Sequence, residues 1–168
     1  MRANQLLDLV HRLYGVTPVV WVGGGWGVDA LVGRQTRPHG DLDVVVDAPA
    51  LPAVLALLEG LGFVATEDWL PVRIEVAHAD GRRVDLHPVT FAEDGSGTQV
   101  GLDGAVFFYP AGCTTTGYVD GQPVICLTAA QQLAFRQGFR WRDVDHHDVA
   151  LLRQVAAAPE PEPPGGDN

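Results

Sequence analysis

Apolar residues recur along this chain with helical spacing in some stretches and with strand-like alternation in others. Apolar positions three and four residues apart mark one face of a helix, whereas strict alternation marks a strand with one buried face. These patterns predict helices at 1–15, 25–33, 51–61, 128–137 and 143–157, and strands at 19–22, 41–46, 63–66, 73–79, 82–89, 116–118 and 123–126. The mixture predicts an α/β (α+β) fold, in which helices flank a mixed central sheet and further helices follow at the C-terminus.

Two Asp-Gly pairs separate predicted strands. Asp80-Gly81 lies between two alternating runs, and Asp120-Gly121 lies between two short apolar runs. Aspartate and glycine tolerate the positive φ angles that tight two-residue turns require. Each pair therefore predicts a β-hairpin.

The C-terminal part of the chain has its own signals. Thr128 and Gln131 have the spacing of a capping box, which marks the beginning of a helix. No linker divides residues 1–157, so we expect a single domain whose helical C-terminal part covers about 128–157. Residues 158–168 are rich in proline, glycine and acidic residues and lack an apolar face, which predicts a disordered tail.

Composition narrows the choice of partners. The 168 residues suffice for a substantial core, and the formal net charge of -10, with no lysine in the sequence, argues against binding nucleic acid. An acidic surface suits cationic small molecules better. No apolar stretch is long enough to cross a membrane, and the first helix lacks the pattern of a signal peptide. We therefore expect a cytoplasmic protein in which Cys113 and Cys126 are reduced and buried.

The most informative stretch is residues 21–46, where a glycine-rich turn is followed by an Asp-x-Asp strand. Side chains alternate along a strand, so Asp41 and Asp43 project from the same face. Neighbouring carboxylates of this kind are ligands for hard divalent ions such as Mg²⁺. In the turn, Gly24 and Gly25 let backbone N–H groups approach a phosphate closely, at the N-terminus of the following helix. A phosphate cradle beside a metal-binding carboxylate pair predicts nucleotide chemistry.

The stretch GGWGVDALVGRQTRPHGDLDV resembles the signature of the lincosamide nucleotidyltransferases of type A, which belong to the DNA polymerase β-like superfamily. It is more loosely similar to the aminoglycoside 2''-nucleotidyltransferases. The resemblance continues in Trp69-Leu70-Pro71, Glu75, Val84-Asp85-Leu86-His87-Pro88, Asp94-Gly95-Ser96, Pro123-Val124-Ile125-Cys126, Gln131-Gln132-Leu133, Gly138 and Asp145-His146-His147-Asp148. One position departs from the pattern, because Gly23 stands where those enzymes more often have aspartate.

The resemblance implies a nucleotidyltransferase fold and transfer of AMP from ATP, with Mg²⁺, to a hydroxyl of an antibiotic, most simply a lincosamide. It also implies that Asp41 and Asp43 bind the metal and that Asp85, on the next hairpin, supplies the third carboxylate. Asp85 is then the candidate general base and a further metal ligand. Members of the family often form homodimers, so a homodimer is expected as well.

Other residues are candidates for binding the two substrates. Arg37 and His39 precede the Asp-x-Asp strand, where a guanidinium or an imidazole can bind phosphate. Trp69 and Tyr109 lie outside the predicted core strands or at their ends, which makes them candidates for the antibiotic pocket. Asp148 is a secondary candidate on the last helix. Asp29 is interpreted as structural, paired with an arginine of the 34–37 loop.

Three alternative functions remain at this point. The first is the same reaction with an aminoglycoside as the acceptor. The second is a non-catalytic, antitoxin-like protein of this fold that binds a protein partner. The third alternative is a metal-dependent hydrolase, because Asp145-His146-His147-Asp148 contains the adjacent His-Asp pairs of phosphohydrolases. Retention of all three expected carboxylates argues against the non-catalytic interpretation.

Overall fold

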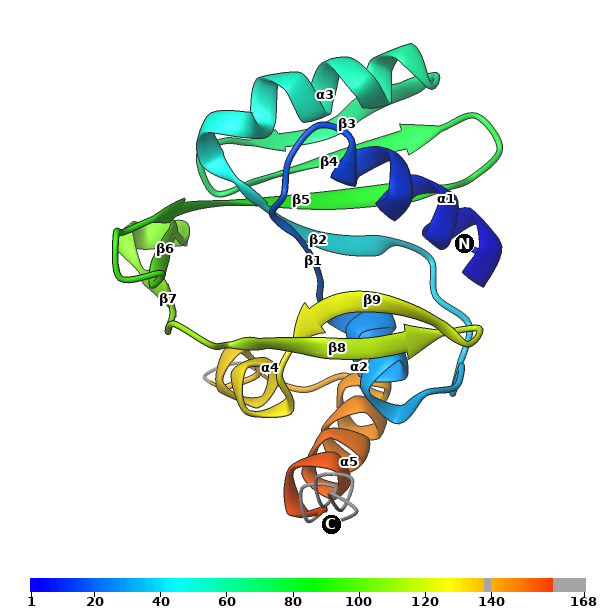
Figure 1. The fold of residues 1–168 in the computed structure, drawn as a ribbon, viewed down its shortest axis with the longest axis vertical. Coiled ribbons are helices and arrows are strands. Elements are labelled where there is room, and N and C mark those ends of the chain that lie inside the picture. The colour runs from blue at the N-terminus through cyan, green and yellow to red at the C-terminus, as the bar shows by residue number, and fades with distance from the viewer. Residues whose placement is uncertain (138–139, 159–168) are drawn as a thin grey trace, which may run out of the picture.

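The computed structural model describes residues 1–137 and 140–158, which form one mixed sheet with helices around it (Figure 1). The helices are α1 (Ala3–Tyr14), α2 (Gly24–Val32), α3 (Leu51–Gly60), α4 (Ala129–Phe135) and α5 (Asp143–Ala157), with short 3-10 turns η1 (Ala48–Ala50) and η2 (Leu102–Gly104). The strands are β1 (Val20–Val22), β2 (Leu42–Asp47), β3 (Phe63–Trp69), β4 (Arg73–His78), β5 (Arg83–Phe91), β6 (Gly97–Val100), β7 (Val106–Tyr109), β8 (Thr114–Val119) and β9 (Gln122–Leu127).

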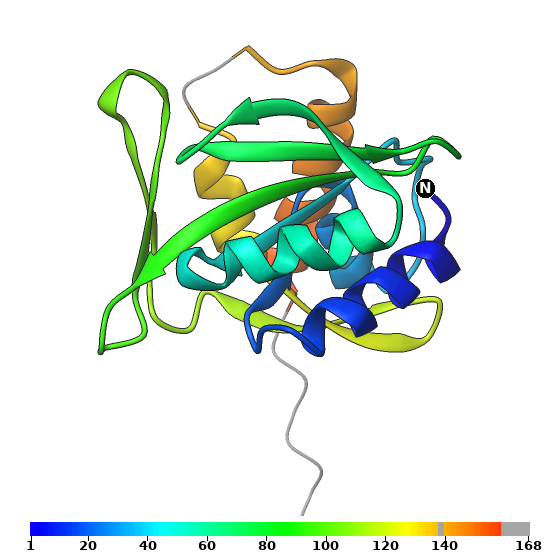
Figure 2. The same cartoon turned by 90° about the horizontal axis from the view of Figure 1, so that it is seen from above.

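The strand order across the sheet is β3-β4-β5-β2-β1-β9-β8. The pairs β2–β5 and β1–β9 are parallel, and their neighbours in the sheet pair antiparallel. The hairpin β6–β7 continues from the end of β5 and projects away from the main sheet, as Figure 2 shows in green. The mixed sheet with flanking helices confirms the expected α+β class.

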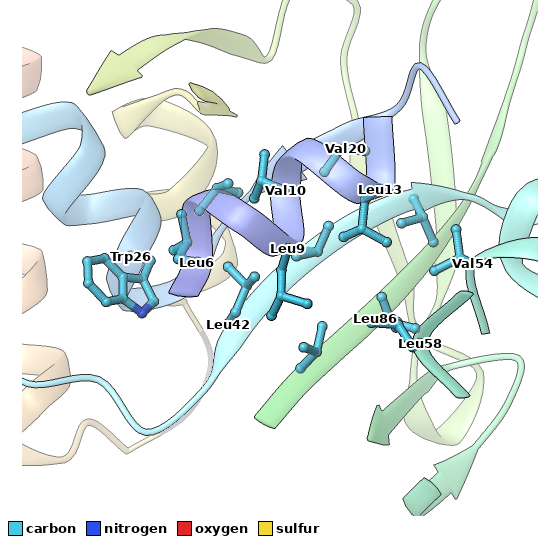
Figure 3. Close-up of a cluster of buried hydrophobic side chains, with 14 of the residues drawn as sticks. Leu6, Leu9, Val10, Leu13, Val20, Trp26, Leu42, Val54, Leu58 and Leu86 are labelled. Carbon is cyan, nitrogen blue, oxygen red and sulfur yellow. The ribbon is translucent and has the colours of Figure 1, made fainter. Parts of the chain in front are cut away.

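One face of the sheet is buried against α1 and α3, which lie on the same side of it (Figure 2). Leu42, Val44 and Val46 alternate along β2 and are fully buried on this face. Figure 3 shows Leu9 of α1 and Leu58 of α3 directed toward the same strands. Each aliphatic side chain removed from water in this way stabilises the fold by roughly 1.5–3 kcal/mol. The alternation that predicted the strands thus defines the core.

The opposite face of the sheet carries the polar side chains that alternate with these buried residues along the strands. Asp43 points away from the core because it follows Leu42 on β2, and Asp85 of β5 is its direct neighbour across the parallel pair. Helix α2 packs against β8 and α5, and α4 packs against α5. These helices and the β6–β7 hairpin enclose a cavity of about 730 Å³ over this face.

Several predicted local signals are confirmed. Asp120 and Gly121 have φ angles of 49° and 74°, as a two-residue hairpin turn requires, whereas Gly81, with a φ of 90°, ends a three-residue turn closed by the hydrogen bond from His78 N–H to the Arg82 carbonyl. The side chain of Thr128 accepts a hydrogen bond from the backbone N–H of Gln131 and so begins α4. None of the helices in the described residues is long and apolar enough to cross a membrane. Apart from Ala158, the predicted tail lies outside the described residues.

Three details differ from the sequence prediction. The hairpin β6–β7 was not expected, because its strands lack a buried apolar face: Val100, Val106 and Phe108 are all exposed. Strand β3 extends to Trp69, three residues beyond its predicted end, because β4 provides hydrogen-bonding partners for an otherwise polar segment. The capping box is only half formed, since the Gln131 side chain donates instead to the Phe108 carbonyl.

Candidate active site

The centre of the site is a carboxylate–histidine cluster formed by Asp43, Asp85 and His87. Asp43 and Asp85 are register partners on β2 and β5, and His87 follows two residues later on the same face of β5. His87 Nε2 lies 3.5 Å from Asp43 Oδ1 and 3.9 Å from Asp85 Oδ2. Among the described residues, this is the only His, Cys, Asp and Glu group compact enough to hold a metal ion. Asp41 lines the same cavity but lies outside the cluster.

The neighbouring carboxylates have pKa values shifted in opposite directions. Burial, reinforced by Asp43, raises the pKa of Asp85 above that of an ordinary aspartate, although His87 opposes the rise. Burial also acts on Asp43, but its pairing with His87 outweighs this effect and lowers the pKa of Asp43. Burial and the Asp43 charge raise the pKa of Asp41. Asp43 is thus held as an anion, whereas Asp85 is the more basic group, as a proton acceptor requires.

The cluster fits a hard divalent cation. Asp85 Oδ1 is buried and has no hydrogen-bond partner among the described residues. A buried carboxylate oxygen without a donor is costly unless a ligand satisfies it. Asp43 offers a second oxygen, and Asp41 a third at the cavity wall. Oxygen donors of this kind are the ligands that Mg²⁺ prefers.

The glycine turn is built closely around the Asp43 side chain. Gly24 has a φ of 55°, and a Cβ atom at this residue would overlap Oδ2 of Asp43. The backbone N–H of Gly23 donates to the Asp43 carbonyl at 2.9 Å, which holds the turn against β2. Only glycine accommodates both the left-handed backbone and the close approach. The N-terminal amides of α2 therefore open into the cavity beside the carboxylates, at an end of the helix that favours anions.

Three of the four arginines that line the cavity pair with carboxylates of α5. Arg37 donates from Nε and Nη2 to the two carboxylate oxygens of Asp148 at 2.9 and 2.8 Å, and this hydrogen bonding raises the pKa of Arg37. Arg136 Nη2 lies 3.4 Å from the same carboxylate. Arg142 Nε lies 3.0 Å from Asp145. Guanidinium groups fixed in this way are suited to bind phosphate oxygens.

His39 does not line the cavity. It is buried beneath the turn, where Nε2 forms a hydrogen bond with Asp29 and the ring lies 4.5 Å from that of Trp26. A Cβ atom at Gly25 would overlap His39 Nδ1, so the imidazole supports the turn from below. Asp29 also accepts hydrogen bonds from the backbone and hydroxyl of Thr36. Asp29 is structural, as expected, but its partners are these two residues and not an arginine.

Tyr109 and Trp69, the two aromatic candidates, have different environments. Tyr109 is 3% exposed, lines the cavity and donates its hydroxyl hydrogen to Gln99 Oε1 at 2.7 Å. Trp69 does not line the cavity; its ring lies 5.4 Å from the Arg73 guanidinium carbon. Arg73 does reach the site, where Nη1 donates to Asp85 Oδ2 at 2.9 Å. Trp69 therefore contacts the site through Arg73.

The structure brings further residues to the cavity that the sequence did not assign. His87 shares the face of β5 with Asp85, so alternation alone was a sufficient signal for it. Arg73, Gln99, Arg136 and Arg142 also line the cavity. They come from β4, β6, the end of α4 and the beginning of α5, and no local pattern in the sequence shows that these elements meet.

The Asp145-His146-His147-Asp148 segment does not form a metal site. Its two aspartates pair with arginines. The His146 ring packs edge-on against Trp141, and His147 Nε2 lies 3.1 Å from the Thr36 hydroxyl. The side chains of the segment are thus engaged by different parts of the fold. This arrangement gives no support to the metal-dependent hydrolase.

Comparisons of the sequence agree with this geometry. The family model of aminoglycoside-2''-adenylyltransferases matches residues 5–152. A lincosamide resistance protein of Staphylococcus haemolyticus is 35% identical over 151 residues, which cover 89% of this chain and 91% of that protein. A 2''-aminoglycoside nucleotidyltransferase of Klebsiella pneumoniae is 41% identical over 66 residues, which cover 37% of each.

Solved structures show the same relationship. The lincomycin-bound lincosamide antibiotic adenylyltransferase LnuA has a TM-score of 0.77 and 32% identity, covering 90% of this chain and 94% of that one. ANT(2'')-Ia in complex with adenylyl-2''-tobramycin has a TM-score of 0.69 and 22% identity, covering 91% and 90%. At that identity the second likeness shows a shared fold. The expected nucleotidyltransferase fold is confirmed.

Proposed function

The chain belongs to the aminoglycoside-2''-adenylyltransferase family of antibiotic nucleotidyltransferases, and from this membership we propose that it transfers AMP from ATP to a hydroxyl of a lincosamide in the presence of Mg²⁺. The observation that carries the proposal is the Asp43–Asp85 pair beside the glycine turn, in a chain similar to a lincosamide resistance protein over 91% of that protein's length. The bulky, anionic adduct prevents the antibiotic from fitting its target, which gives resistance. Use of ATP places the reaction in the cytoplasm.

The triphosphate lies along the N-terminus of α2. The backbone amides of Gly24 and Gly25 face the cavity there, and Arg37, directly beside Gly25, and Arg136 provide cationic groups in the same cavity. Asp41, Asp43 and Asp85 would hold Mg²⁺, which would neutralise negative charge on the phosphates. Together these groups position the α-phosphate next to the carboxylates.

The acceptor hydroxyl attacks the α-phosphorus, and the bond from phosphorus to the bridging oxygen of pyrophosphate breaks. Asp85 takes the proton of the hydroxyl, because burial raises its pKa whereas the pKa of Asp43, its neighbour in the cluster, is lowered. Arg73 donates to Asp85 Oδ2 and so leaves the unpartnered Oδ1 as the atom that receives the proton or contacts the metal. One carboxylate thus orients the acceptor and activates it.

The remaining cavity wall favours a lincosamide over an aminoglycoside. Val72, Leu102 and Phe107 contribute apolar surface to it. Asp145 and Asp148 also line the cavity, but arginines already neutralise both. An aminoglycoside carries several ammonium groups and needs free carboxylates, whereas a lincosamide carries one amine beside apolar groups and sugar hydroxyls. This pairing of the acidic side chains is the structural reason for our choice of acceptor.

A competition experiment tests the acceptor directly. Purified protein is given ATP, Mg²⁺ and equal amounts of lincomycin and tobramycin, and the products are read by mass spectrometry for an added AMP. We expect the adduct on lincomycin alone. Asp43→Asn is the inactive control, with Asp47→Asn at the far end of β2 as the matched variant that retains activity. AMP found only on tobramycin would mean that the acceptor is an aminoglycoside. No adduct on either compound would refute the proposed reaction.

We take the protein to act as a homodimer, as the family resemblance implies. Support comes from the β6–β7 hairpin, which projects from the sheet and leaves Val106 64%, Phe107 40% and Phe108 55% exposed. Apolar side chains gathered on a projecting hairpin are typical of a subunit contact. Light scattering should give twice the mass of the chain, and Phe108→Ser should lower it. A monomeric wild type at assay concentrations contradicts the assignment.

A further inference from the structure

His87 presents Nε2 to Asp43 and Asp85, as a third metal ligand would. A neutral imidazole carries one hydrogen, on either Nδ1 or Nε2, and only the nitrogen without it has the lone pair that binds a metal. The group on the far side of the ring decides which nitrogen carries the hydrogen. In this protein that group is Gln99 of β6, which is 5% exposed.

The orientation of the Gln99 amide is fixed by its neighbours. Its nitrogen Nε2 lies 2.8 Å from the carbonyl oxygen of Val72, which can only accept a hydrogen bond. Turning the amide over would bring two carbonyl oxygens together at this distance. Oε1 accepts the hydroxyl hydrogen of Tyr109 at 2.7 Å, on the other side of the amide. Gln99 and Tyr109 are both buried, so the amide has little access to water as an alternative partner.

The same Gln99 nitrogen lies 3.1 Å from His87 Nδ1. One of its hydrogens goes to Val72, so the second is directed at the imidazole, and Nδ1 must accept it. The hydrogen of the neutral ring is then on Nε2, facing Asp43 and Asp85.

We propose that His87 directs an Nε2–H donor at the metal-binding carboxylate of Asp43 and is not a metal ligand, and that Gln99 is the positioning residue that fixes this tautomer. The proposal rests on the proposed function only in taking Asp43 and Asp85 as metal ligands. Its consequence is a metal site made of oxygen atoms alone. Such a site suits Mg²⁺ and Mn²⁺, whereas an imidazole ligand would favour Zn²⁺ and other late transition metals. The β6–β7 hairpin thereby contributes to the choice of metal from outside the coordination sphere.

The tautomer is measured in the wild-type protein without metal or substrate, by long-range ¹H–¹⁵N correlation of the histidine side chains at mildly alkaline pH. The histidine ring signal that is missing from the spectrum of His87→Asn is assigned to His87. We expect the Nε2–H form for His87. A neutral ring protonated on Nδ1 overturns the proposal. This measurement needs no turnover, so its outcome is independent of whether lincomycin is the acceptor.

Two further measurements separate positioning from simple packing. Gln99→Leu should abolish the tautomer preference, whereas Gln122→Leu, at an exposed glutamine of β9, should leave it unchanged. Electron spin-echo modulation of the Mn²⁺-loaded wild type detects any nitrogen bound directly to the ion. We expect none, and a coordinated imidazole nitrogen overturns the proposal. An unchanged His87 tautomer in Gln99→Leu refutes the part assigned to Gln99.

Discussion

Arg37 and Asp148, 111 residues apart in the sequence, are joined by two parallel hydrogen bonds between guanidinium and carboxylate. The pair links the loop before β2 to α5, and Arg136 contacts the same carboxylate from the end of α4. Asp148 is only 2% exposed, so loss of the arginines would leave a buried carboxylate without its partners. The arginines we assign to the triphosphate are therefore held in place by a helix at the far end of the chain.

Asp148→Asn should weaken both stability and nucleotide binding. The amide cannot pair with two guanidinium groups, so the free energy of unfolding should fall by about 1–3 kcal/mol. We expect KM for ATP to rise more than kcat falls, because the arginines lose their orientation. Urea denaturation and initial-rate kinetics measure the two effects. Asp143→Asn, at an exposed position of α5, is the control; equal effects of the two substitutions would contradict the role of Asp148.

Gly24→Ala should abolish transfer. The added methyl group would overlap Asp43 Oδ2, and the backbone φ of 55° is unfavourable for alanine. Displacement of a metal-binding carboxylate should lower kcat by about 10³-fold, a loss of roughly 4 kcal/mol of transition-state stabilisation. Gly40→Ala is the matched control, because no atom lies within 4 Å of a Cβ at that residue. A Gly24→Ala enzyme with normal turnover would show that the turn and Asp43 are not coupled.

Asp85→Asn distinguishes a proton acceptor from a metal ligand. If Asp85 chiefly accepts the proton, the variant should bind ATP and lincomycin normally but transfer AMP about 10²–10⁴-fold more slowly. Raising the pH should then restore part of the rate, because the acceptor hydroxyl ionises more readily. Isothermal titration and single-turnover kinetics separate the two steps. Loss of ATP binding in this variant would mean that coordination of the metal is the main role of Asp85.

Stability at alkaline pH should depend on Tyr109. Burial raises the pKa of Tyr109, so the folded protein keeps the phenol protonated where the unfolded chain, with a pKa of about 10, has lost the proton. Stability is thus fully present below this value and falls by up to about 1.4 kcal/mol per pH unit above it.

Denaturation of Tyr109→Phe over the same pH range tests this. The variant lacks the hydrogen bond to Gln99 and should be about 1 kcal/mol less stable at neutral pH. Its alkaline slope should be shallower, so the two stability curves should approach each other as pH rises. Tyr118→Phe, at a residue that is 51% exposed, controls for removal of a hydroxyl group alone. Parallel curves for wild type and Tyr109→Phe would exclude this source of alkaline instability.

Local patterns were enough to predict the elements that carry the carboxylates. Asp43 and Asp85 lie on strands with clear alternation, and Gly24 lies in a turn that needs a positive φ. These signals are contained within a few neighbouring residues. His87 was visible on the same face as Asp85, but its partner Gln99 lies on a hairpin whose exposed side chains give no amphipathic pattern.

The arginines that line the cavity illustrate which contacts the sequence pattern does not predict. Arg37 was assigned to phosphate from its type and position, whereas the contact of Arg136 with Asp148 depends on how α4 and α5 pack. His39 has a suitable residue type for phosphate binding, but its hydrogen bond with the buried Asp29 holds the ring beneath the turn. Such contacts depend on packing between distant segments, which residue spacing along the chain does not predict.

The two parallel strand pairs also govern the order in which the molecule assembles. Asp43 meets Asp85, and Val22 meets Cys126, only after long segments of chain have closed into loops, which costs conformational entropy. Contacts of this range form slowly compared with helices such as α1 and α3. We therefore expect the carboxylates to come together after most of the helical structure has formed. During refolding, adenylyl transfer should return later than the helical circular dichroism signal.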